Sequence, residues 1–444
     1  MKSRSSVQPI PIAQAAIAFL VITLLSACAA PGSAPVLPTE TSMSEPTMPA
    51  LSVSPTAAPS ALPTINPQTD PPEPYPLPTG GAGVPAQPGA MAPTQTAVSV
   101  SASQLVAYIG MDGNLWVLDQ PGAAPRQLTT DGTPVISTGA QAGEQVSYYF
   151  PALSSDGTLL AYRRDAGTPV DSGLQYQFGL WVIDLNTGEA QQIVDKIPAG
   201  FFWKPGTHLL TYGLGAADGD FASRGQPAPD LATGIWAVDL DEGEPYELVR
   251  PERGYTLARP LWAPDGSRLS FEEVVNMEGS GNFAVYDLAM QAYTPWEKPL
   301  GIVDWAPDGA QIAYDYMTYS ATGTERVYLN NKDGSAEQQF SPDPEQGYTW
   351  YPVFSPSGES LAYILHEGAL DDTTNTLVVQ DLAGGEPRSL GIFASILDLE
   401  WSPDGESLVF SAGPFEARQV IAVDVADGSS AILAAGGSPV LTTP

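Results

Sequence analysis

The sequence predicts an all-β domain built from repeated four-stranded sheets. Within residues 104–444, short runs of β-branched and aromatic residues alternate with Asp-Gly and Gly-Glu turns. The same order of strands and turns also returns at intervals of roughly 45 to 60 residues. A unit of four strands that recurs in this way is typical of a β-propeller, in which each unit forms one blade of a ring.

Residues 1–27 are predicted to be a signal peptide. Lys2 and Arg4 give a charged start, and the apolar run Ile12–Leu25 is too short to span a bilayer comfortably. The segment runs into Leu25-Ser26-Ala27-Cys28, which resembles the lipobox of bacterial lipoproteins. The resemblance implies cleavage before Cys28 and lipidation of its thiol. The alternative is an ordinary signal peptide followed by an incidental cysteine.

Cys28 is the single cysteine of the chain, so no disulfide can form within it. Ala29 follows it, and the lipoprotein resemblance places the inner-membrane retention signal, an Asp, at that position. We therefore expect an extracytoplasmic protein, lipid-anchored to the cell membrane or the outer membrane.

Residues 28–103 are predicted to be the lipidated cysteine followed by a disordered tether. Pro, Thr, Ser and Ala dominate this segment, which offers too little apolar surface to offset the entropy of ordering. Pro at this density favours extended polyproline segments, so we expect a spacer between membrane and domain.

Residues 104–444 are predicted to form the propeller. Six copies of an apolar strand, a tight turn and a second strand begin at Phe150, Ala199, Arg259, Ile302, Tyr351 and Leu397. A third strand such as "GLWVIDLNTGE" and a shorter fourth follow each copy. Asp-Gly suits the first turn because a hairpin needs positive φ at low cost. One aromatic per copy is predicted to pack between blades: Trp203, Trp262, Trp305, Phe354 and Trp401.

The first-turn motif resembles the repeat W-S-P-D-G-x-x-[LI]-A-[FY] of TolB-like and WD-repeat-like bacterial propellers. Residues 401–405 and 305–309 match it closely, whereas the turn after Trp203 is one residue shorter. The resemblance implies a fold and not an activity. TolB carries an additional α/β domain where this chain has a tether, so its role is not carried over.

The two ends of the domain are predicted to share one blade. The segment from Gln104 supplies the second to fourth strands of a blade but lacks the first, and the tail from Gly436 can supply it. This arrangement gives seven blades and removes exposed sheet edges. The alternative is six blades with an extra hairpin outside the ring.

The charge and the rare residue types limit the function. Lys and Arg number 17 against 50 Asp and Glu, a net charge of −33, which disfavours nucleic acid. His208, expected inside a strand, and His366, expected in a rim loop, are the two histidines, and no G-x-S-x-G motif occurs. These counts disfavour a zinc site and a Ser-His-Asp triad.

A binding site is expected where the long connections gather, on one end of the ring. These connections are predicted at 163–179, 213–234, 272–282, 315–326, 365–375 and 411–419. The candidate rim residues are Tyr148, Tyr149, Arg163, Arg164, Arg259, Trp350, Tyr351, His366 and Arg418.

No cofactor is predicted. Turn aspartates are expected to bond their own turns, and the acids left over lie in loops, at Asp218, Asp220, Glu272-Glu273 and Asp371-Asp372. Calcium at Asp218 and Asp220 is a weaker alternative, because no full D-x-D-x-D-G loop occurs.

Two functions remain open. The first is a monomeric binding or scaffolding module for an envelope protein or glycan. The second is a carbohydrate-active enzyme, a glycosidase or lyase, for which Asp304, Asp398 and Glu400 are the acids nearest the first strands. Acids that converge at the centre of the ring would favour the enzyme.

Overall fold

The computed structural model describes residues 105–120, 122–134, 143–170, 173–214, 233–274, 281–296, 298–317, 325–343, 347–368 and 374–442. Strands make up most of these residues, turns and connections make up the rest, and the one helical element among them is a short 3-10 turn, η1 (Phe415–Ala417). Among them, no helix is long and apolar enough to cross a membrane. The predicted signal peptide, Cys28 and the tether to residue 103 lie outside the described residues.

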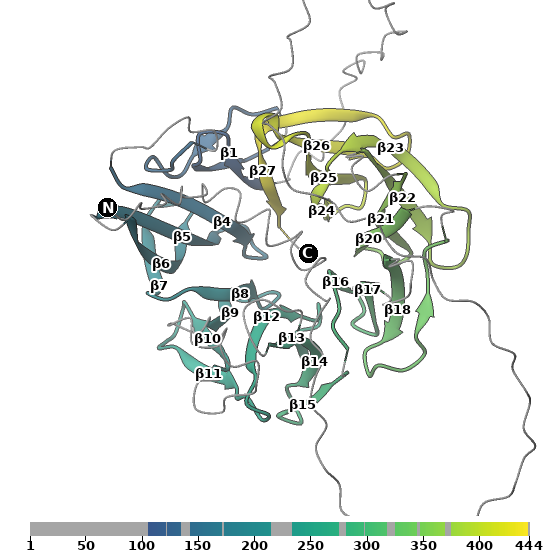
Figure 1. Cartoon of the computed structure of the whole chain (residues 1–444), viewed down its shortest axis with the longest axis horizontal. Helices are drawn as coiled ribbons and strands as arrows, with labels where there is room; N and C mark the ends of the chain where they lie inside the picture. The colour runs from purple at the N-terminus through teal and green to yellow at the C-terminus, as the bar shows by residue number, and fades with distance from the viewer. Residues whose placement is uncertain are drawn as a thin grey trace, which may run out of the picture. The chain divides into compact units, whose positions relative to one another are not determined.

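The strands form seven blades of four antiparallel strands, arranged around a centre (Figure 1). Blade 1 consists of the second half of β27 (Ser430–Leu441) with β1 (Val106–Gly110), β2 (Leu115–Leu118) and β3 (Arg126–Gln127). Blade 2 consists of β4 (Gln145–Leu153), β5 (Leu159–Val170), β6 (Gly173–Asp184) and β7 (Ala190–Val194). Blade 3 consists of β8 (Pro198–Trp203), β9 (Leu209–Leu214), β10 (Ile235–Asp239) and β11 (Tyr246–Val249).

The remaining blades repeat this order. Blade 4 consists of β12 (Thr256–Trp262), β13 (Arg268–Val274), β14 (Asn282–Asp287) and β15 (Ala292–Pro295). Blade 5 consists of β16 (Val303–Trp305), β17 (Gln311–Met317), β18 (Glu325–Asn331) and β19 (Gln338–Gln339). Blade 6 consists of β20 (Gly347–Phe354), β21 (Ser360–Glu367), β22 (Thr374–Asp381) and β23 (Arg388–Ala394). Blade 7 consists of β24 (Leu397–Trp401), β25 (Ser407–Ala412), β26 (Gln419–Asp424) and the first half of β27.

β27 closes the ring. Its first half pairs with β26, with Ser430 opposite Val423, and its second half pairs with β1, with Leu441 opposite Val106. The chain therefore passes directly from the outermost strand of blade 7 to the innermost strand of blade 1. The prediction of seven blades closed by the terminal strands is confirmed, and the six-bladed alternative is wrong.

The core lies between the blades. Seven hydrophobic clusters occur, and each joins one pair of neighbouring blades, including blade 7 with blade 1. The predicted inter-blade aromatics belong to them, although Trp401 is half-buried. The Trp305 indole nitrogen donates to the Ser270 hydroxyl of the preceding blade over 3.1 Å. Such bonds fix the position of one blade on the next.

The first turns have the predicted conformation. Their glycines adopt positive φ, for example 65° at Gly266 and 74° at Gly405. The turn aspartates bond their own turns, as Asp265 does by accepting the Ser267 N–H over 2.9 Å. The predicted turn chemistry is therefore confirmed.

One predicted long connection is wrong. Residues 163–179 do not form a loop, because β5 and β6 pair continuously from Leu159 opposite Asp184 to Val170 opposite Gly173. Residues 411–419 contain η1, and the other predicted connections fall partly outside the described residues.

Candidate functional site

The candidate site lies at the end of the ring where the first strands begin and the second strands finish, which we call the entry end. The pairing of Tyr148 with Arg164 and of Tyr149 with Arg163 places these four residues there. Arg259, Trp350 and Tyr351 lie in the middle of the first strands β12 and β20, His366 near the end of a second strand, and Arg418 just before a third. The predicted rim residues are thus spread from the entry end to the middle of the innermost strands.

Six of the seven first strands carry a bulge within the strand. In each, the residue three positions before the inter-blade position has positive φ: Phe150, Gly200, Arg259, Tyr351, Asp398 and Ser438. Glycine is required at Gly200, because an added Cβ would lie 2.7 Å from the Arg259 Cα. Bulges re-aim side chains at barrel rims and active sites, and a bulky residue with positive φ is uncommon. The bulges re-aim a side chain on five of these strands, because Gly200 has none.

Two bulge residues are exposed. The Phe150 residue is 64% exposed although it belongs to an innermost strand. The Arg259 side chain is 69% exposed, and its guanidinium bonds the buried Glu272 carboxylate over 2.9 Å. An exposed aromatic ring and an oriented guanidinium on a rigid strand are groups that binding surfaces use.

The rim residues of blade 2 are partnered. The Tyr148 hydroxyl donates to the Asp131 carboxylate, which also accepts from Arg164 over 2.8 Å. Burial, together with Asp131, raises the pKa of Tyr148 to about 12. The Arg163 guanidinium pairs with Asp165 over 2.6 Å and lies 5.3 Å from the centre of the Tyr149 ring. These bonds hold the surface rigid.

Three of the rim residues of blades 6 and 7, Trp350, Tyr351 and Arg418, are half-buried. Trp350 and Tyr351 meet edge to face, with ring centres 5.9 Å apart. The Trp350 indole nitrogen and Arg418 Nε are buried and have no hydrogen-bond partner among the described residues. Burial lowers the pKa of Arg418, and the charge of Asp398 opposes this shift.

Three acids interact where the first strands of blades 5 and 7 lie. The Asp304 carboxylate accepts the Phe354 N–H over 2.7 Å, and the Glu400 carboxylate accepts the Leu441 N–H over 2.8 Å. Burial raises the pKa of Asp304 to about 7. Burial, with the charges of Asp398 and Asp304, raises the pKa of Glu400 to about 8. Each of these two groups therefore ties its blade to the next, and Glu400 keeps its proton at neutral pH more than Asp304 does.

Asp398 belongs to the same group. It accepts the Ser411 hydroxyl over 2.9 Å, and burial raises its pKa. The pKa of Tyr351 lies well above its usual range because the ring is buried near Asp398, Glu400 and Asp315. The acids singled out from the sequence thus act on one another.

The sequence reasoning missed a further pair, Asp315 and Glu325, in blade 5. Asp315 accepts the Ile302 N–H of its own blade and the Tyr351 N–H of the next, each over 2.9 Å. Burial raises the pKa of both acids, which are hydrogen-bonded to one another. One sequence signal could have pointed to Asp315. An acid follows an aromatic of the second strand in two blades, as Asp315 follows Tyr314 and Glu272 follows Phe271.

Both histidines lie in other surroundings than the sequence predicted. His366 is not in a rim loop but in β21, 1% exposed and stacked on Tyr348 with ring centres 4.7 Å apart. His208 is not a core residue inside a strand but lies in the first turn of blade 3, just before β9.

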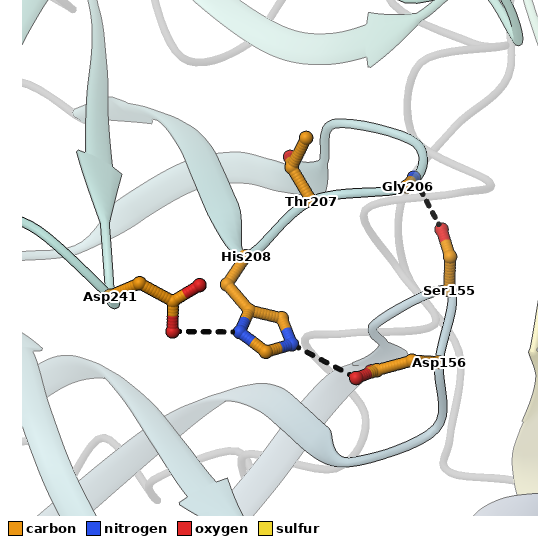
Figure 2. A pocket seen from close by; sticks show the side chains of 6 residues that line it. All are labelled: Ser155, Asp156, Gly206, Thr207, His208 and Asp241. Atoms are coloured by element: carbon orange, nitrogen blue, oxygen red, sulfur yellow. Dashed lines mark hydrogen bonds and ion pairs between the residues drawn. The ribbon is translucent and has the colours of Figure 1, made fainter.

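His208 lines a cavity of about 410 Å³ at the opposite end of the ring (Figure 2). The Nδ1 atom of its imidazole lies 3.0 Å from the Asp241 carboxylate of the same blade, and the Nε2 atom lies 3.1 Å from the Asp156 carboxylate of blade 2. The two carboxylates lie on opposite sides of the imidazole (Figure 2). These hydrogen bonds raise the pKa of His208, that to Asp241 most. Both imidazole nitrogens are occupied by carboxylates of this chain. His208 therefore links blade 2 to blade 3, and we call this Asp156–His208–Asp241 link the staple.

No predicted metal site is found in the part of the chain that the structure describes. There, no group of three or more His, Cys, Asp or Glu could hold a metal ion. Glu272 and Glu273 pair with Arg259 and Arg253 instead. Asp218, Asp220 and the pair 371–372 lie outside the described residues.

One curated relative matches part of the chain, and no family model matches it. Dipeptidyl-peptidase 5 of Porphyromonas gingivalis is 29% identical over 225 residues, covering 48% of this chain and 30% of that protein. The chain therefore spans less than a third of the length of this relative.

Several solved structures share the fold. An oligogalacturonate lyase in complex with manganese is 17% identical, with 74% of this chain and 83% of that chain covered and a TM-score of 0.51. A prolyl endopeptidase is 15% identical, with 77% and 49% covered and a TM-score of 0.50. TolB from Acinetobacter baumannii is 14% identical, with 77% and 67% covered and a TM-score of 0.44. At these identities the likeness to the first two structures shows the fold alone. The closed ring of seven four-stranded sheets makes the chain a β-propeller, as its TolB-like repeats predicted.

Proposed function

We propose that the chain is a membrane-anchored, extracytoplasmic β-propeller that binds a protein or glycan of the cell envelope at its entry end. The observation that supports this most is the exposed pair Phe150 and Arg259, held on innermost strands by bulges. A rigid ring whose bulges re-aim different side chains on several innermost strands suits recognition, because little conformational freedom is lost on binding.

The anchor rests on the lipobox-like residues 25–28. Replacing Cys28→Ser removes the thiol that the lipid would modify. We expect the variant to leave the membrane fraction and to lack the acyl mass on its N-terminal peptide in mass spectrometry. Unchanged membrane association of the variant would exclude this anchor.

Binding at the entry end is tested with full-length protein and envelope extract. We expect Phe150→Ala and Arg259→Ala to reduce capture of the partner at least about tenfold, as central contacts do. Met290→Ala is the matched control, because Met290 is 75% exposed in the turn between β14 and β15, at the opposite end. Equal capture by all four proteins would contradict the proposal.

A carbohydrate-active enzyme is the second candidate. Its support is the interaction of Glu400 with Asp398 and Asp304, because a carboxyl that keeps its proton near pH 7 can act as a general acid. Against it, Glu400 and Asp304 each already accept a backbone N–H of the neighbouring blade. Cleavage of an envelope polysaccharide that Glu400→Gln abolishes would favour the enzyme over the binding module.

A further inference from the structure

The hairpin of β5 and β6 is longer than its counterparts. It pairs over twelve residues, whereas the second and third strands of blades 4 and 6 pair over six. β4 accompanies β5 as far as Gly167, opposite Gln145. The hairpin therefore extends past the entry end of its own blade.

The outer edge of this extension is unpaired. β7 pairs with β6 at residues 180–183, and none of the described strands pairs with the edge at Leu174–Phe178. An unpaired strand edge presents a row of N–H and C=O groups that another strand can bond.

The register shows which backbone groups face outward. The Leu185 N–H donates to the Thr158 carbonyl over 2.8 Å, which fixes a hydrogen-bonded pair there, and bonded and non-bonded pairs then alternate along the hairpin as far as Val170 opposite Gly173. Leu174, Tyr176 and Phe178 then direct their N–H and C=O groups away from β5. Pro169, which has no N–H, lies opposite Leu174 at a non-bonded position, as this register requires.

The side chains beside the edge are aromatic. Tyr176 and Phe178 stack with ring centres 5.8 Å apart. The Arg163 guanidinium lies 5.7 Å from the centre of the Phe178 ring and is paired with Asp165. Tyr176 and Phe178, which we call the aromatic strip, are half-buried. Arg163 beside them is already paired with Asp165, so it does not attract an acidic segment.

We propose that the Leu174–Phe178 edge binds an extended segment of a partner protein as an added strand. Main-chain bonds would supply affinity, and the aromatic strip would select neighbouring apolar side chains. The segment is neutral or basic, because a chain of net charge −33 repels acidic partners and a second copy of itself. The inference rests on the proposed binding function and gives it a partner chemistry.

Hydrogen exchange tests the edge directly. The full chain is mixed with a ten-residue peptide that alternates valine and lysine, with a valine–glutamate peptide as the charge-reversed control. We expect exchange at the amides of Leu174, Tyr176 and Phe178 to slow at least about tenfold with the basic peptide, since added-strand bonds protect amides. The acidic peptide should protect them less.

Tyr176→Pro removes one outward N–H without breaking a bond to β5, and it should abolish protection at an unchanged melting temperature. Tyr176→Thr keeps the N–H and should retain protection. No slowing at saturating basic peptide, or equal slowing in Tyr176→Pro, would overturn the proposal. A dimer in sedimentation velocity that Tyr176→Pro abolishes would also overturn it, because the edge would then hold a second copy. If the basic peptide does not protect the edge but Phe150→Ala still reduces capture of the partner, the added-strand proposal is wrong and the proposed binding function remains.

Discussion

At the scale of single residues, burial separates the acids into two groups. Turn aspartates such as Asp265 are solvated and bonded to their own turns, which lowers the pKa of that carboxyl. Asp304 and Glu400 are desolvated and bond the backbone of the next blade, so their pKa values rise to about 7 and about 8. The same residue type therefore contributes to stability with opposite dependence on pH.

Glu400→Gln should change how stability depends on pH. The pKa of Glu400 is raised on folding from 4.5 to about 8, so its contribution is fully present below about pH 4.5 and is lost as pH rises through about 8. The substituted glutamine keeps an acceptor for the Leu441 N–H but does not ionise. We expect the melting temperature of the variant, relative to the wild type, to rise by a few degrees from pH 5 to pH 9. A constant difference across that range would show that Glu400 does not titrate there.

Asp241→Asn should lower the pKa of His208. Asp241 and Asp156 raise it in the folded protein, so the staple stabilises the fold below about pH 6.5 and weakens as pH rises through the raised pKa. The chain has two histidines, so their ring signals can be followed by NMR. The buried His366 signal serves as the control. An unchanged His208 titration in Asp241→Asn would contradict the ion pair.

At the scale of elements, the first strand of each blade does most of the positioning. On five of the seven first strands a bulge re-aims a side chain, and the inter-blade residue of each first strand packs on the preceding blade. The β5–β6 hairpin departs from the common length, and the sequence does not reveal this, because "TPVDSGLQ" at 168–175 has the composition of a loop. Tertiary context, not propensity, extends those strands.

Trp305→Ala should destabilise the ring more than Trp401→Ala. Trp305 is 3% exposed and bonds the Ser270 hydroxyl, whereas Trp401 is half-buried and bonds the Val353 carbonyl. A buried tryptophan replaced by alanine costs about 3–5 kcal/mol, and the half-buried one should cost less. Denaturant unfolding measures both. Equal losses would mean that exposure does not set the cost.

At the scale of the whole molecule, the fold was predictable and much of the site was not. The Asp-Gly turns and Trp305-like positions recur once per blade, so repetition revealed the architecture. The turn after Trp203 was expected to be one residue shorter than the others, but it has the common length, because Trp203 lies opposite Leu210 as Trp401 lies opposite Leu408. His208 therefore falls in the turn and not in the strand. His366 was misplaced because β21 continues to Glu367, and strand boundaries are the least certain part of a sequence-based prediction. Asp315 and Glu325 were missed because their meeting depends on three-dimensional packing, not on spacing in the sequence.

The strand β27, which joins blade 7 to blade 1, offers the most direct test that the ring is closed. Deleting residues 436–444 removes the half of β27 that pairs with β1, including the Leu441 N–H that Glu400 accepts. Deleting residues 442–444 leaves that pairing intact and serves as the control. We expect calorimetry to show a melting temperature lower by roughly 10 °C or more for the longer deletion and nearly unchanged for the shorter, because an open ring exposes the innermost face of blade 1. A longer deletion that melts at the wild-type temperature would contradict a ring closed by β27.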